Sequence, residues 1–198
     1  MDNWHPFRLG KRPLLAIRMH RIIVRELGRE LPSFFAFAEK IRSSQTTWIV
    51  DKLGWLGKNR FNYNSYAHSH SPEHCQTNGG PFKNAEWLFD LHWYTEGKVP
   101  YTTTNLHLAV ECEWQQKRKK DKANAFSGIK YDFQKLMVTN AEYRLMIFKI
   151  SHLSDLEVLD IYFAGNIQNY RQLPSGARFL FIAFYKRKKT FYYQELIK

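Results

Sequence analysis

The chain has 198 residues, 44% of them hydrophobic and 16% aromatic, and it carries a formal net charge of +12 at pH 7 with a pI of about 9.7. This composition excludes an intrinsically disordered chain and predicts one domain with a substantial core. The excess of positive charge favours a polyanionic partner, nucleic acid before an anionic membrane surface.

The sequence contains no apolar run long enough to cross a membrane, and the first residues lack the basic region and apolar run of a secretory signal. Its two cysteines, Cys75 and Cys112, lie far apart, and Cys112 falls within an apolar strand pattern. We therefore expect no structural disulfide. We expect a cytoplasmic location without membrane contact.

The N-terminal part, residues 1–57, is predicted to be helical. Apolar residues at helical spacing indicate one helix over residues 13–28, a second that opens at Pro32, and a third over residues 48–56. Residues 58–84 are rich in Asn, Ser, His and Gly, which predicts a long loop.

This loop contains three histidines and a cysteine, His68, His70, His74 and Cys75, which invite a zinc interpretation. No second pair of ligands with zinc-finger spacing occurs elsewhere, and the paired thiolates of structural zinc sites are missing. We therefore interpret the segment as a solvated, histidine-rich loop.

From residue 86 onward the pattern predicts an α/β core that extends to residue 198. Alternation of apolar residues indicates strands over residues 87–94 and 106–114, which we expect to pair antiparallel. Asp132 is placed as the N-cap of a short helix through about Thr139, and Ser154-x-x-Glu157 as a capping box that opens a longer helix.

Three further apolar runs, residues 144–150, 179–185 and 191–197, have the length of strands. Helices between consecutive strands suggest crossover connections and partly parallel pairing. The expected fold is a single domain of the α/β class, with a central mixed β-sheet flanked by helices on both faces and a helical N-terminal region.

Three carboxylates are expected to gather on one face of this sheet. Glu111 and Glu113 alternate on the strand over residues 106–114, on the same face as His107 and Ala109, while Asp90 lies on the preceding strand. If the strands pair with these faces aligned, the acids can hold one hard cation, Mg²⁺ or Mn²⁺. Lys135, expected in the first turn of the next helix, could reach the same place and assist phosphodiester hydrolysis.

Each of these residues also has a simpler interpretation. Glu111 and Glu113 could form a solvated acidic face or surface salt bridges, and Asp90 could be a buried acid paired with an arginine. Lys135 could be an ordinary solvated helix residue. An acid from the N-terminal helices could instead complete the site, and the candidates are Glu26, Glu30 and Glu39.

An acid on one strand, a paired acid motif on the next, and a helix and strand behind them resemble the PD-(D/E)xK restriction-endonuclease-like nuclease superfamily over about residues 86–185. The resemblance rests on Asp90, on Glu111-Cys112-Glu113 and on Lys135. It implies a restriction-endonuclease-like core, and metal binding by Asp90, Glu111 and the backbone carbonyl of Cys112.

This sequence departs from the superfamily pattern at two positions. Phe89 stands where the pattern has proline, and Glu113 stands where it has lysine. The resemblance assigns the role of that lysine to Lys135 and leaves Glu113 as a metal ligand, a general base or a sign of lost activity. It implies a metal-dependent endonuclease, a hydrolase acting on DNA.

Two basic runs could contact a phosphate backbone without reading its sequence. They are Lys117, Arg118, Lys119 and Lys120, and Lys186, Arg187, Lys188 and Lys189. Cutting both strands of a duplex would favour a homodimer. The alternative functions are a catalytically inactive nucleic-acid-binding protein on the same fold, and an interaction subunit of a larger nucleic-acid machine.

Overall fold

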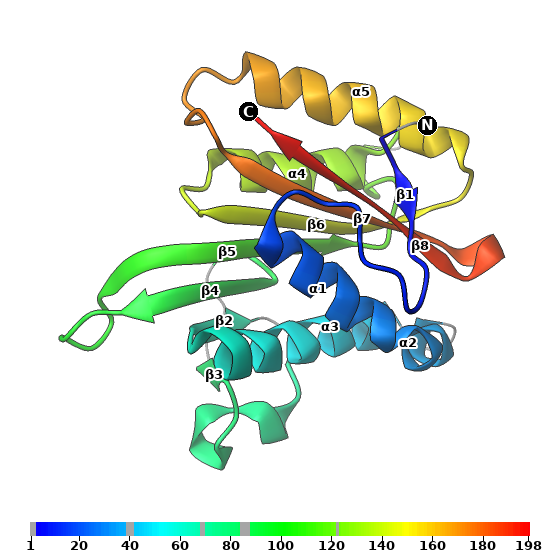
Figure 1. The fold of residues 1–198 in the computed structure, drawn as a ribbon. Helices are drawn as coiled ribbons and strands as arrows, with labels where there is room; N and C mark the ends of the chain where they lie inside the picture. The colour runs from blue at the N-terminus through cyan, green and yellow to red at the C-terminus, as the bar shows by residue number, and fades with distance from the viewer. Residues whose placement is uncertain (1–2, 39–41, 68–69, 84–87, 122) are drawn as a thin grey trace.

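The computed structural model describes residues 3–38, 42–67, 70–83, 88–121 and 123–198. Within these residues the chain forms five α-helices and one eight-stranded mixed sheet with the strand order β1-β8-β7-β6-β5-β4-β2-β3 (Figure 1). The strands are β1 (His5–Pro6), β2 (Asn64–Ala67), β3 (Phe82–Lys83), β4 (Leu91–Glu96), β5 (Thr103–Glu113), β6 (Tyr143–Ile150), β7 (Arg178–Tyr185) and β8 (Thr190–Ile197). The predicted α/β class is confirmed.

The centre of the sheet is parallel because helices connect its strands. Helix α4 (Ser127–Val138) joins β5 to β6, and helix α5 (Ser154–Asn169) joins β6 to β7. The predicted antiparallel pairing of β4 with β5 is confirmed, and β8 is also antiparallel to β7. The carboxyl ends of β5, β6 and β7 therefore lie along the same edge of the sheet.

Helices cover both faces of the sheet, as predicted (Figure 1). Helices α1 (Arg18–Arg29), α2 (Leu31–Ala38) and α3 (Arg42–Leu56) pack on one face, and α4 and α5 pack on the other. In β6, Leu145 and Ile147 face the N-terminal helices while Met146 and Phe148 face α4 and α5. Burial on both faces explains why this strand is a continuous apolar run.

The segment predicted as a loop, residues 58–84, contains more structure than its composition suggests. A π-helix (Gly57–Phe61) extends α3, and β2 and β3 add to the sheet beyond β4. These strands have only four and two residues, too few to show the apolar alternation that reveals a strand in a sequence. The strand predicted from residue 87 begins at Leu91, and residues 84–87 lie outside the described part of the chain.

A β-bulge changes the faces of the first half of β5. Trp93 pairs with Leu108 and Tyr94 with Leu106, so His107 is skipped. The predicted alternation holds after the bulge, but Leu106 packs with the core on the α4 side, and His107 stacks on the Tyr63 ring at 3.8 Å on the other side. The predicted faces of Leu106 and His107 are therefore wrong.

The predicted start of α4 is wrong, and α5 begins at Ser154 as predicted but without the predicted capping box. Helix α4 begins at Ser127, so Asp132 lies inside it, and Lys135 lies in the last turn instead of the first. In α5 the Ser154 side chain makes no capping bond. The Asp155 carboxylate accepts hydrogen bonds from the backbone N–H groups of Ser151 and His152, both at 3.0 Å, and ties the turn that precedes the helix to its first turn.

Two expectations about the whole chain can be compared with the described residues. No helix among them has the length and apolar character needed to span a membrane. Cys75 and Cys112 are both free, as expected from their positions.

Candidate functional site

Two carboxylates of β5 lie on the face of the sheet that α4 covers. From Leu108 to Trp114 alternate residues point to opposite faces, so Glu111 and Glu113 share the face of Ala109, as predicted. Glu111 is only 1% exposed, and Glu113 is partly buried. A buried carboxylate costs free energy unless a positive charge or hydrogen-bond donors compensate it.

Lys135 supplies that positive charge from α4. Its ammonium nitrogen lies 2.8 Å from Oε1 of Glu111 and 3.1 Å from Oδ1 of Asp132, which is one turn earlier on the helix. The predicted approach of Lys135 to the acids of β5 is therefore present in the structure, although it comes from the last turn of α4. Asp132 joins the cluster as a fourth acid that the sequence analysis had placed at a helix cap.

Asp90 directly precedes β4 and lies beside the end of β5. Its Oδ2 accepts a hydrogen bond of 2.7 Å from the backbone N–H of Cys112. The register pairs Leu91 with Val110, so the β4–β5 ladder has ended at this point and the Asp90 carboxylate continues it. The N–H and C=O of one strand residue point to the same side, so the Cys112 carbonyl opens toward Asp90.

Glu113 lies against the first turn of α4. Its Oε1 accepts a hydrogen bond of 2.6 Å from the backbone N–H of Gln115. A Cβ atom at Gly128 would lie 2.9 Å from Oε2 of Glu113 and 2.3 Å from the carbonyl oxygen of Gln115. Glycine at residue 128 therefore allows the helix start and the strand end to approach each other.

Burial, with a smaller contribution from mutual repulsion, changes the protonation of the acids. Burial, with the negative charge of Asp90, raises the pKa of Glu111 to about 9. Burial also raises the pKa of Glu113 to about 6, with contributions from the charges of Asp132 and Asp90. Burial alone would lower the pKa of Lys135, but its contacts with Glu111 and Asp132 outweigh burial and raise it, so the ammonium stays charged.

The first basic run is connected to this cluster. Lys117, Arg118, Lys119 and Lys120 are all exposed in the segment that follows β5. The guanidinium of Arg118 lies 3.8 Å from the centre of the Tyr131 ring, and Lys135 lies 6.0 Å from the same ring. Tyr131, which the sequence analysis did not single out, therefore holds a cation of the run close to the acids.

The second basic run extends from the same edge of the sheet. Lys186, Arg187, Lys188 and Lys189 are exposed between β7 and β8. Because β5 and β7 are both parallel to β6, this turn leaves the sheet at the edge where Glu113 ends β5. The two runs and the carboxylate cluster thus lie at the same edge of the sheet.

Of the acids proposed from the N-terminal helices, the two that the structure describes, Glu26 and Glu30, do not join the cluster. Glu26 pairs with Arg29 at 2.9 Å and Glu30 pairs with Lys52 at 3.2 Å, in the helical layer on the opposite face of the sheet. Glu39 lies outside the described residues.

The histidine-rich segment makes separate contacts. Nε2 of His70 lies 3.2 Å from Sγ of Cys75, and His74 pairs with Asp51 at 3.0 Å. His68 lies outside the described residues. His70 thus contacts a residue of the same segment, whereas His74 connects the segment to α3.

The carboxylate cluster fits a divalent ion by its chemistry but not yet by its arrangement. Carboxylate and carbonyl oxygens are the ligands that Mg²⁺ and Mn²⁺ prefer, and four acids stand against one lysine. Within the described ranges, however, no group of three or more His, Cys, Asp or Glu side chains is arranged to hold a metal ion. In this structure Glu111 contacts the ammonium of Lys135.

Comparisons of this chain with protein-family models, with curated proteins and with solved structures found no match. A functional assignment therefore rests on the chemistry of the site.

Proposed function

We propose that the protein is a Mg²⁺- or Mn²⁺-dependent nuclease that hydrolyses phosphodiester bonds, with DNA as its substrate. The observation that carries the proposal is the contact between Lys135 and the buried Glu111, with Asp90, Glu113 and Asp132 around it. The proposal agrees with the resemblance to the PD-(D/E)xK superfamily, in which acids on neighbouring strands and a lysine act together.

The metal ion would be held by Asp90, Glu111 and the carbonyl of Cys112. When bound, it would act as a Lewis acid that stabilises negative charge on the phosphate. Gathering these ligands requires Glu111 to exchange the ammonium of Lys135 for the ion, because the ammonium lies 2.8 Å from its Oε1.

The other residues of the cluster have roles that follow from their protonation. Glu113, with a pKa of about 6, is mostly ionised at neutral pH and can accept a proton from the attacking water. Lys135 stays charged and can donate a hydrogen bond to a phosphate oxygen in the transition state. Arg118, stacked on Tyr131, can contact a neighbouring phosphate.

The alternative is a nucleic-acid-binding protein on the same fold that has lost catalysis. Two observations favour it: Glu113 stands in place of the motif lysine, and the described residues hold no gathered metal-ligand group. Binding that depends on salt but not on EDTA, without nicking under any divalent ion, would support this alternative.

The decisive experiment is incubation with supercoiled plasmid in Mg²⁺ or Mn²⁺, with EDTA as the blank. Wild type is expected to nick the plasmid, and Glu111→Ala to lose at least about 10²-fold in rate. Asp90→Asn retains an oxygen that can accept the Cys112 hydrogen bond but loses the charge, so it should fold and fail to cleave. Cleavage that survives Glu111→Ala would refute the site assignment.

A second readout does not depend on activity. Mg²⁺ or Mn²⁺ should raise the melting temperature of the wild type and of Glu73→Ala, which removes an exposed carboxylate in the Pro72–His74 turn. The ions should not raise the melting temperature of Glu111→Ala. An equal rise in all three proteins would place the metal elsewhere.

A further inference from the structure

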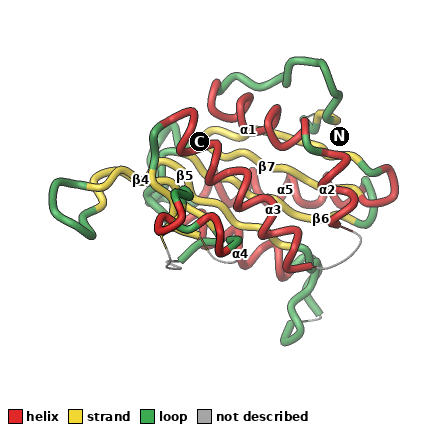
Figure 2. Tube along the Cα trace, turned by 90° about the horizontal axis from the view of Figure 1, so that it is seen from below, coloured by secondary structure: helices red, strands yellow, loops and turns green. Residues whose placement is uncertain are grey.

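A basic groove lies on the face of the molecule that carries the N-terminal helices. Its volume is about 870 Å³, and it is bounded by α1, by the loop of residues 7–13 and by the end of the π-helix (Gly57–Phe61). Figure 2 shows this loop arching over α1. The described residues that line the groove include seven arginines and lysines and no acid.

Four of these cations form a stripe along α1: Arg18, Arg21, Arg25 and Arg29. Their spacing of three, four and four residues places them on one side of the helix. At a rise of about 1.5 Å per residue the stripe extends about 16 Å. Lys11 and Arg12 from the loop and Arg60 from the π-helix add positive charge around it.

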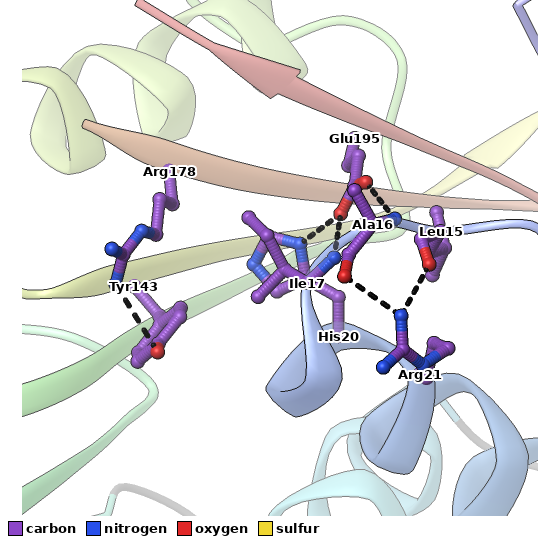
Figure 3. Close-up of polar contacts among 8 residues, drawn as sticks. All are labelled: Leu15, Ala16, Ile17, His20, Arg21, Tyr143, Arg178 and Glu195. Carbon is purple, nitrogen blue, oxygen red and sulfur yellow. Dashed lines mark hydrogen bonds and ion pairs between the residues drawn. The ribbon is translucent and has the colours of Figure 1, made fainter. Parts of the chain in front are cut away.

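Part of this charge is used within the protein. Arg21 donates hydrogen bonds of 2.7 Å to the carbonyl oxygens of Leu15 and Ala16 (Figure 3). Arg25 and Arg29 both contact Glu26, at 3.4 and 2.9 Å.

The other four cations remain available to a ligand. They are Lys11, Arg12, Arg18 and Arg60, all exposed, and none of them pairs with a carboxylate in the part of the chain that the structure describes. Cations that converge on one concavity repel each other, and an anionic ligand relieves that repulsion.

Contacts with the sheet hold α1 in place. The carboxylate of Glu195 on β8 accepts hydrogen bonds from the backbone N–H groups of Ala16 and of Ile17, the latter at 3.2 Å, and contacts Nδ1 of His20 at 2.9 Å (Figure 3). This carboxylate caps the start of the helix that carries the arginine stripe.

Close packing also holds the loop against the helix. The Phe7 ring lies so close to Gly28 that a Cβ atom there would be 2.1 Å from its Cζ. The loop then turns at Gly10, whose φ of +76° favours glycine. The shape of the groove is therefore fixed by the backbone positions of the loop and of α1, in addition to the side chains that line it.

We propose that this groove binds the backbone of single-stranded nucleic acid. The partly buried ring of Phe61 lines the groove among the cations, together with Ile22 and the exposed side chain of Leu9. Proteins that bind single strands combine a cationic groove with apolar and aromatic side chains that contact the exposed bases. A duplex hides its bases, and a flat bilayer does not enter a concave site.

The groove is distinct from the carboxylate cluster, because α1 packs on one face of the sheet and Glu111 lies on the other. The inference goes beyond the proposed nuclease and does not rest on it, since binding in the groove requires neither a metal ion nor cleavage.

The test is fluorescence anisotropy with an end-labelled single-stranded oligonucleotide of about 20 nucleotides, in EDTA, over a series of salt concentrations. The variant Arg18→Glu/Arg60→Glu reverses two exposed charges of the groove. The matched control, Lys98→Glu/Arg171→Glu, reverses two exposed cations outside the groove and outside both basic runs. Both variants lower the net charge by the same amount, and circular dichroism confirms that each is folded.

The groove variant is expected to bind at least tenfold more weakly, and the control to change less than about threefold. The slope of log K against log salt should fall by about 1 to 1.5 in the groove variant, because single strands release about 0.7 counterion per phosphate contact. Equal weakening of both variants would overturn the proposal, as would stronger binding of a duplex or of anionic vesicles. If binding survives in the groove variant while Glu111→Ala abolishes cleavage, the groove assignment fails and the nuclease proposal stands.

Discussion

The ammonium nitrogen of Lys135 lies 2.8 Å from the carboxylate of Glu111, although one residue comes from helix α4 and the other from strand β5. The contact joins the crossover helix to the central strand at a carboxylate that is only 1% exposed. Asp132 shares the same ammonium at 3.1 Å. The charge state of this pair underlies the first two predictions.

Lys135→Met is expected to reduce plasmid cleavage by about 10²-fold, because it removes a charged donor aimed at the acids. Lys130→Met is the matched control: it changes the same residue type on the same helix, at a lysine that lies over the Tyr162 ring at 5.0 Å. Initial nicking rates in Mg²⁺ provide the measurement. Similar rates in the two variants would exclude a catalytic role for Lys135.

Glu111→Gln is expected to make the metal-free protein more stable at high pH. Burial, then the charge of Asp90, raises the pKa of Glu111 to about 9, whereas the unfolded chain releases the proton near its ordinary value of 4.5. Between these values the folded state binds more protons, so the stability of the wild type falls as pH rises. The variant has no titratable group at residue 111, so its free energy of unfolding does not fall with pH for this reason.

Urea unfolding in EDTA from about pH 5 to about pH 8.5 measures this effect. The free energy of unfolding of Glu111→Gln relative to wild type should rise across this window by about 1 kcal/mol or more. Glu73→Gln, which changes an exposed carboxylate, should show no such trend. A difference that stays constant with pH would mean that Glu111 is ionised throughout.

Two glycines on helices should respond oppositely to alanine. Gly128→Ala places a Cβ atom 2.3 Å from the carbonyl oxygen of Gln115, so the start of α4 must move away from Glu113. We expect a loss of about 1 to 3 kcal/mol in the free energy of unfolding. Gly165→Ala in α5 meets nothing within 4 Å and should gain about 0.5 to 1 kcal/mol. Chemical denaturation measures both, and a stable Gly128→Ala variant would contradict the observed close approach.

Glu195→Gln is expected to weaken the attachment of α1 to β8. Burial pushes the pKa of Glu195 up, but hydrogen bonds from His20, Ala16 and Ile17 outweigh burial and lower it. A lowered pKa means that the stabilisation is present above the unfolded value near 4.5 and is lost as the pH falls below it.

The variant should therefore lose about 1 to 2 kcal/mol at about pH 7, the usual effect of a helix cap, and the difference from wild type should shrink below about pH 4. Urea unfolding at the two pH values checks this. A difference that is the same at both would show that the charge of Glu195 contributes nothing.

The class of fold could be predicted from the sequence because burial leaves a direct pattern. The apolar runs of β6 and β7 are buried on both faces, and helices between strands of this kind lead to parallel pairing. The alternation from Leu108 to Trp114 placed Glu111 and Glu113 on one face correctly. Strands β2 and β3 escaped prediction because their partners, not their own composition, make them strands.

What the sequence determined by itself is the local pattern: which residues are buried, which are charged, and which acids share a face of a strand. Only the tertiary structure decided that Lys135 reaches Glu111, that Asp132 belongs to the cluster and that Arg118 stacks on Tyr131. It also brought Arg60 to the arginine stripe of α1. The physical reason is that these contacts join segments far apart in the chain, so they depend on how helices and strands pack and not on the spacing of residues within any one of them.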